Sequence, residues 1–133
     1  MRKSSVIGTI AGTFLVSASF VSASGALAGP WEDGMVAYNR GDYVPAIRLV
    51  RPLAEKGNAK AQSLIGVMYR KGEGVARNPT RAFMWFSFAA KRGDGKAKAE
   101  LREVSRTMTP AEISQAREMA QACEASDYRS CEY

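Results

Sequence analysis

Histidine is absent from this chain, so the commonest general base and the commonest metal ligand are both missing. Cysteine is scarce: the 133 residues contain two, and they do not form a Cys-x-x-Cys redox motif. Two cysteines without histidine make a poor zinc site. We therefore expect no metal centre and no cofactor.

The motifs of several enzyme classes are also missing. No Gly-x-Ser-x-Gly elbow occurs, and no Ser-x-x-Lys follows residue 28. The Gly72-Glu73-Gly74 turn lacks the Lys and Ser/Thr of a phosphate-binding loop, so it is better explained as a turn between helices. The carboxylates are scattered along the chain. We expect no catalytic residues, and a hydrolase is the least supported function.

A long apolar run occurs only near the N-terminus, from about Val6 to Val21. Arg2 and Lys3 precede it, and the small-x-small sequence Ala26-Leu27-Ala28 follows it. This order predicts a secretory signal peptide over residues 1–28. The alternative is a membrane anchor, but the run is short for a bilayer and rich in small polar residues. We expect cleavage, no stable membrane insertion afterwards, and a periplasmic or secreted protein.

The mature chain, residues 29–133, is long enough for one small domain with a modest core. Without Arg2 and Lys3 the 19 basic residues become 17, against 13 acidic ones, a formal net charge of +4. An exported protein rarely meets nucleic acid, so no nucleic-acid partner is expected. The charge is suited to acidic proteins, to anionic envelope polymers, or simply to solubility.

Both cysteines, Cys123 and Cys131, lie in the last eleven residues. Export would place them in an oxidising compartment, where paired thiols form disulfides. We predict a structural disulfide that ties down a tail over residues 126–133.

The chain resembles itself at a shift of 36 residues. Asn58 aligns with Asp94 and Asp42 with Asn78, all of them residues that cap helix N-termini. Gly57 aligns with Gly93, and both could end a helix in the left-handed conformation. The matched apolar pairs are Ala46 with Ala82, Leu49 with Trp85, Val50 with Phe86 and Ala54 with Ala90. A period of this length is typical of a two-helix solenoid unit.

Caps and apolar periodicity predict an all-α chain of about six helices and no strand. Pro79 should begin the fourth helix, and Thr109-Pro110-Ala111-Glu112 has the pattern of a capping box. The predicted ranges are 31–40, 42–56, 58–70, 79–93, 95–106 and 110–125.

Residues 59–93 resemble a Sel-one-like repeat, a relative of the tetratricopeptide repeat. The positions that carry the resemblance are Ala59, Ala61, Ile65, Gly66, Tyr69, Gly72, Gly74, Val75, Ala82, Trp85, Ala89, Ala90 and Gly93. Residues 34–57 resemble a shorter copy, and Met108–Ala120 resembles the closing helix of small bacterial members. The repeat domain is expected to span residues 29–125.

The resemblance implies antiparallel helix pairs stacked as a short right-handed α-solenoid. It also implies an adaptor, regulator or scaffold that binds another protein in the cell envelope, here expected as a monomer. Binding would use the concave face, with Tyr38, Arg40, Tyr69 and Arg70 as candidates. The alternative ligand is a cell-wall glycan or a β-lactam-like small molecule, which some cysteine-rich members bind. Those members carry a disulfide in every repeat, which this chain does not.

The fourth helix is unusually rich in large apolar residues, four of them aromatic: Phe83, Met84, Trp85, Phe86 and Phe88 point around its whole circumference. Two interpretations follow. A central helix would be buried on all sides, which we favour, or some of these side chains would form an exposed apolar anchor for a partner.

Overall fold

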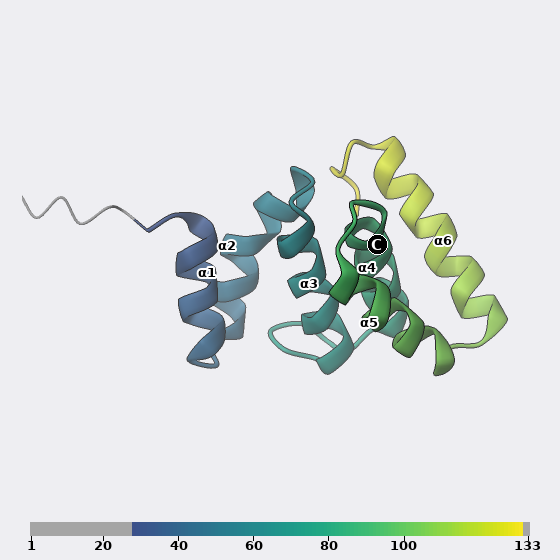
Figure 1. The fold of residues 1–133 in the computed structure, drawn as a ribbon, viewed down its shortest axis with the longest axis horizontal. Coiled ribbons are helices and arrows are strands. Elements are labelled where there is room, and N and C mark those ends of the chain that lie inside the picture. Colours follow the sequence, from purple (N-terminus) through teal and green to yellow (C-terminus); the bar gives the residue numbers. More distant parts are fainter. Residues whose placement is uncertain (1–27, 132–133) are drawn as a thin grey trace, which may run out of the picture.

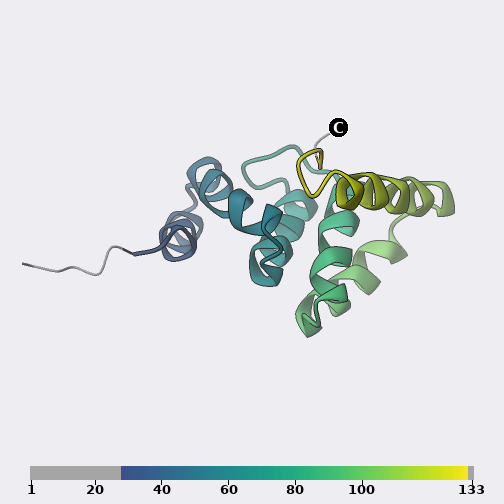
Figure 2. The ribbon, with the colours of Figure 1, turned by 90° about the horizontal axis from the view of Figure 1, so that it is seen from above.

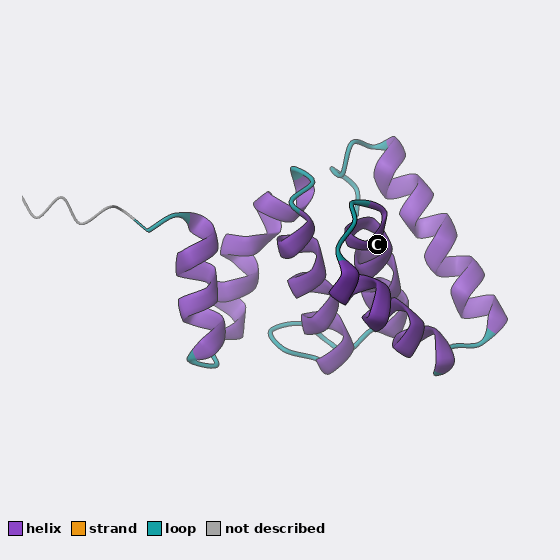
Figure 3. Ribbon diagram, viewed as in Figure 1, coloured by secondary structure: helices purple, strands orange, loops and turns teal. Residues whose placement is uncertain are grey.

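The computed structural model describes residues 28–131, and throughout that range it contains helices and loops but no strand (Figure 3). The predicted all-α class is therefore confirmed. The predicted helix ranges agree with those of the structure to within one or two residues. The helices are α1 (Pro30–Asn39), α2 (Tyr43–Glu55), α3 (Ala59–Lys71), α4 (Pro79–Lys91), α5 (Gly95–Arg106) and α6 (Pro110–Ala125).

The helix N-termini are capped largely as the sequence predicts. Asn58 and Asp94 begin equivalent helices, and each side chain accepts a hydrogen bond from the backbone N–H three residues later, at 3.0 and 2.9 Å. Thr109 and Glu112 form the predicted capping box. Asp42 occupies the N-cap position of α2, but its side chain makes no capping hydrogen bond.

The helix C-termini end in a shared backbone pattern. Gly41, Gly57 and Gly93 have φ values of +83°, +88° and +90°, a conformation that glycine adopts without steric cost. In each case the next residue donates its N–H to the carbonyl five positions back, as in a Schellman motif. These turns set the angle at which each helix meets the next.

The helices follow one another from α1 at one end of the molecule to α6 at the other (Figures 1 and 2). From α1 to α5, each helix packs on the next one along the chain. Helix α6 is the exception, because it packs mainly on α4. Helix α4 thus contacts α3, α5 and α6, and its aromatic side chains are all at most 7% exposed. The interpretation of α4 as a buried central helix is confirmed, and an exposed aromatic anchor on this helix is excluded.

Close approach between paired helices depends on two glycines. A Cβ atom on Gly66 of α3 would lie 2.6 Å from the ring of Phe86 on α4, and one on Gly34 of α1 would lie 2.6 Å from Val50 on α2. Val50 and Phe86 are equivalent at the shift of 36 residues. The same glycine-to-apolar contact therefore joins both helix pairs.

The turn after α3 is the other position where glycine is required. Gly72 ends α3 with a φ of +74°, and Gly74 has a φ of +72°. A Cβ atom on Gly74 would lie 2.8 Å from the backbone carbonyl of Tyr43 at the start of α2. The Gly-x-Gly turn is thus pressed against the preceding helix pair.

The alanines of the repeat lie on α4. Ala82 and Ala89 are fully buried there, and Ala90 is partly buried.

The tail after α6 turns back as predicted. Cys123 and Cys131 form a disulfide, and the chain reverses at Asp127 and Tyr128, which have φ values of 55° and 60°. The Tyr128 ring packs edge-on against Phe88 of α4, with ring centroids 5.3 Å apart. The tail therefore covers part of the central helix.

The predicted signal peptide falls almost wholly outside the described residues, and its cleavage remains a prediction. From residue 28 to residue 131, no helix is both long and apolar enough to span a lipid bilayer.

Candidate functional site

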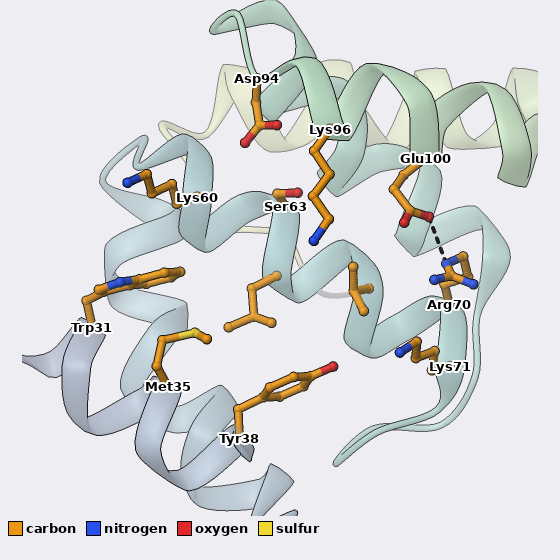
Figure 4. Close-up of a pocket in the computed structure, with 12 residues that line it drawn as sticks. Trp31, Met35, Tyr38, Lys60, Ser63, Arg70, Lys71, Asp94, Lys96 and Glu100 are labelled. Carbon is orange, nitrogen blue, oxygen red and sulfur yellow. Dashed lines mark ion pairs between the residues drawn. The ribbon is translucent and has the colours of Figure 1, made fainter.

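An open groove runs along the exposed side of α3. Its volume is about 350 Å³, and its walls come from α1, α3 and the start of α5 (Figure 4). The lining residues are Trp31, Met35, Tyr38, Lys60, Ser63, Leu64, Val67, Arg70, Lys71, Asp94, Lys96 and Glu100. They belong to the first helix of each of the three helix pairs, apart from Asp94, which caps α5.

The groove combines apolar and charged residues. Trp31 and Met35 of α1 and Leu64 and Val67 of α3 line it, and all four are partly buried. The charged residues lie along α3 and α5 (Figure 4). Such a mixture can bind a chain that presents both apolar and polar groups.

Arg70 and Glu100 join α3 to α5 across the groove. Arg70 Nε lies 3.1 Å from Glu100 Oε2, and the two side chains are 32% and 21% exposed. The Nε atom makes no well-aligned hydrogen bond, so the contact is mainly electrostatic. Being partly screened by solvent, the pair contributes only modestly to stability.

Tyr38 joins α1 to the Gly-x-Gly turn. Its hydroxyl donates a 2.7 Å hydrogen bond to Glu73 Oε2. Burial, and then this bond to a carboxylate, raise the pKa of the Tyr38 phenol above its usual value. Tyr38 therefore stays protonated at neutral pH and acts as a donor. The bond holds the turn of one repeat against the first helix of the repeat before it.

The groove includes two of the four residues that the sequence suggested for partner binding. Tyr38 and Arg70 line it. Arg40 is exposed at the C-terminal end of α1, outside the groove. Tyr69 is only 3% exposed and lies within the core.

Tyr69 contacts the start of α4. Its backbone carbonyl accepts a 2.8 Å hydrogen bond from Asn78 N–H, and its ring lies 5.6 Å beneath the guanidinium of Arg81. Arg81 Nη1 also lies 3.4 Å from the Tyr69 hydroxyl. These contacts position the turn between α3 and α4.

Sequence reasoning missed the groove residues Trp31, Lys60 and Lys96. One signal was available for the lysines, because Lys60 and Lys96 are themselves 36 residues apart. Each is the second residue of its helix, directly after the Asn58 or Asp94 cap region. Trp31 has no counterpart in the other repeats, so the repeat pattern could not predict it.

The carboxylates of the groove are already engaged. Asp94 accepts the capping bond from Ala97 N–H, and Glu100 pairs with Arg70. Among the described residues, no group of three or more Cys, Asp or Glu side chains could hold a metal ion.

Residues 59–94 match the family model of the Sel1 repeat. The match covers α3, the Gly-x-Gly turn, α4 and the cap of α5. It includes all eight residues that the sequence identified as structural: Gly66, Gly72, Gly74, Ala82, Trp85, Ala89, Ala90 and Gly93. The helices on either side of the matched segment extend the stack in both directions.

One relative is "Chitin synthase regulatory factor 3" of Schizosaccharomyces pombe (strain 972 / ATCC 24843). It is 50% identical over 48 residues, which is 36% of this chain. The matched segment covers only 5% of that protein, so the similarity concerns a short segment and not the whole molecule.

Proposed function

We propose that this protein is an exported helical-repeat module that binds another protein through the groove between α1, α3 and α5. Sel1 repeats form protein-interaction surfaces, and this chain contains a matching repeat flanked by further helices. The observation that carries the proposal is the composition of the groove. Three consecutive helix pairs contribute only their first helix or its cap to this open surface.

The shape of the groove favours protein binding over the alternative ligands. A small-molecule site is generally a deep and mostly apolar cavity that encloses its ligand. This groove is only partly enclosed and half of its lining residues are charged, and its two carboxylates already have hydrogen-bond or ion-pair partners within the protein. No observation on the structure specifically favours a glycan or a β-lactam-like compound.

Export would place the module in a bacterial cell envelope, as an adaptor, regulator or scaffold. The support is the N-terminal sequence of Arg2, Lys3, the apolar run and Ala26-Leu27-Ala28. The matched relative is named as a regulatory factor, which agrees with a module that acts by binding.

Site-directed photo-crosslinking tests the proposal. A photoreactive amino acid is introduced at Met35 in the groove and, as a matched control, at Gln115, which is exposed on α6 outside the groove. Irradiation of cells that produce the full chain should yield a protein adduct of defined mass from position 35 and little from position 115. Equal cross-linking at both positions, or none at position 35, would contradict binding through the groove.

A further inference from the structure

The groove contains two lysines without a counter-charge. No ion pair or side-chain hydrogen bond is made by Lys60 or Lys96 within residues 28–131, and both side chains are exposed. Glu100 pairs with Arg70, whereas Asp94 caps α5 and keeps its negative charge. The lining still contains four basic residues against two acidic ones, so the groove has a net positive charge.

The position of the lysines makes this surplus costly. Lys60 and Lys96 are the second residues of α3 and α5, where the helix dipole disfavours a positive charge. Helix α3 has no acidic residue at its start, and α5 has only its cap, Asp94. The same arrangement occurs twice, at equivalent positions of successive repeats, and both copies line one groove.

Ser63 provides a further polar group at the same place. It is only 7% exposed and lines the groove together with the two lysines (Figure 4). Its hydroxyl makes no hydrogen bond to any of the residues that the structure describes. The hydroxyl is not among the buried polar atoms left without a partner, so it is open to the groove, where a polar group of a ligand can replace water as its hydrogen-bond partner.

The apolar side of the groove supplies the second requirement. Trp31 and Met35 of α1 line the groove together with Leu64 and Val67 of α3 and the two lysines. A ligand that fits both sides must present a large apolar side chain beside negative charge. From Lys60 to Lys71, α3 spans roughly 16 Å, given about 1.5 Å per helical residue. An extended peptide would cover this with about five residues.

We infer that the groove binds an extended acidic segment of a partner protein, with a large apolar side chain between Trp31 and Leu64 and carboxylates at Lys60, Lys96 and Ser63. This inference rests on the proposed protein-binding function and adds the chemistry of the partner. Charge complementarity carries it: the lining has four basic residues against two acidic ones, and Lys60 and Lys96 have no ion-pair partner in the described residues.

Fluorescence anisotropy with labelled peptides tests the inference. The probe is a rhodamine-labelled, C-terminally amidated Glu-Leu-Glu-Leu-Glu peptide, and the comparison peptides replace all Glu by Lys, all Glu by Ser, or both Leu by Ser. The protein should bind the Glu-Leu peptide more tightly than the other three. Raising the salt concentration should weaken this binding, because exposed charges are screened.

Charge-reversal variants locate the site. The double variant Lys60→Glu with Lys96→Glu should weaken binding of the Glu-Leu peptide at least about tenfold at low salt, as expected for charges that face the ligand. The control Lys98→Glu makes the same charge change on an exposed part of α5 outside the groove and should alter affinity less than about twofold. Circular dichroism melts check that each variant remains folded.

Several outcomes would overturn the inference. Equal weakening by Lys98→Glu would show that net charge, and not the groove, attracts the peptide. Equal binding of the Lys-Leu or Glu-Ser peptide would show that carboxylates or apolar side chains are not selected. Binding to phosphatidylglycerol vesicles that the double variant abolishes would assign the lysines to a membrane surface. In each case cross-linking at position 35 would still test the protein-binding function separately.

Discussion

At the scale of single residues, packing between α3 and α4 depends on the absence of one side chain. Gly66 lets the Phe86 ring lie where a Cβ atom would be 2.6 Å from it. Phe86 is fully buried and has little room to move. The glycine that marks the repeat in sequence is thus required by the aromatic residue twenty positions later.

Gly66→Ala is expected to destabilise the protein by about 1–3 kcal/mol, because overpacking outweighs the better helix propensity of alanine. Gly95→Ala is the matched control. A Cβ atom at Gly95 meets nothing within 4 Å, so this change should be neutral or slightly stabilising. Urea unfolding of both variants measures the difference. A Gly66→Ala protein as stable as the Gly95→Ala protein would show that the Phe86 ring can move aside.

Trp85→Ala should destabilise the protein by roughly 3–5 kcal/mol, the usual cost of emptying a buried large aromatic site. Trp85 is 3% exposed and packs edge-on against Phe88, with ring centroids 5.7 Å apart. The loss is a large share of the stability of a domain of this size. A thermal melt whose midpoint barely changes would contradict the burial of Trp85.

At the scale of elements, the helix caps differ in what they contribute. Asp94 and Asp42 both stand directly before a helix, but only the Asp94 side chain accepts a backbone hydrogen bond. Residue type alone predicted two equivalent caps. The orientation of the Asp42 side chain was decided by its local backbone, with φ −82° and ψ 66°.

Asp94→Ala is therefore expected to lower the free energy of unfolding by about 1 kcal/mol, the typical value of an N-cap bond. Asp42→Ala should cost clearly less. Chemical denaturation of the two variants under identical conditions gives the comparison. Equal losses would show that Asp42 forms its capping bond in solution.

The disulfide acts on the last helix. It links Cys123, in the last turn of α6, to Cys131 and holds Tyr128 against Phe88. The end of a helical stack has a neighbour on one side only and frays first. A link across about nine residues contributes roughly 2.5 kcal/mol in the chain-entropy description.

Cys123→Ser should consequently loosen α6 and the tail, seen as faster amide hydrogen exchange there. Binding of the Glu-Leu peptide in the groove should be largely retained, because no residue of α6 lines it. Cys131→Ser should behave in the same way, since it breaks the same bond. Loss of peptide binding while α6 stays protected would instead make the tail part of the functional site.

At the scale of the whole molecule, the groove exists only because three helix pairs are stacked. Its residues range from Trp31 to Glu100 in sequence. No single pair contains both the apolar side and the two unpaired lysines. The Tyr38–Glu73 bond and the Arg70–Glu100 pair connect neighbouring pairs along its length.

If the protein is exported, its signal peptide should be removed. The mature chain should begin at Gly29, because Ala26 and Ala28 fit the cleavage pattern and the apolar run before them is short for an anchor. Intact mass and N-terminal sequencing of the protein from a periplasmic extract measure this. A mass that still includes residues 1–28 would contradict cleavage and soluble release.

Local features of this protein were readable from its sequence. The caps Asn58, Asn78 and Asp94, the left-handed glycines and the capping box at Thr109 depend on interactions within a few residues. The helix ranges followed from them, and the period of 36 residues indicated the stack. Burial of the aromatic residues on α4 followed from the need of a central helix to cover all its faces.

The binding surface was decided by the tertiary structure. Tyr69 and Arg70 are neighbours in sequence, but successive helical residues point about 100° apart, so Tyr69 enters the core while Arg70 faces the groove. In the sequence, Lys60 and Lys96 are indistinguishable from ordinary surface lysines. Only the packing of α3 and α5 brings both of them to the same groove. Sequence determined the helices because their signals are local, and packing determined the site because its residues meet only across three helix pairs.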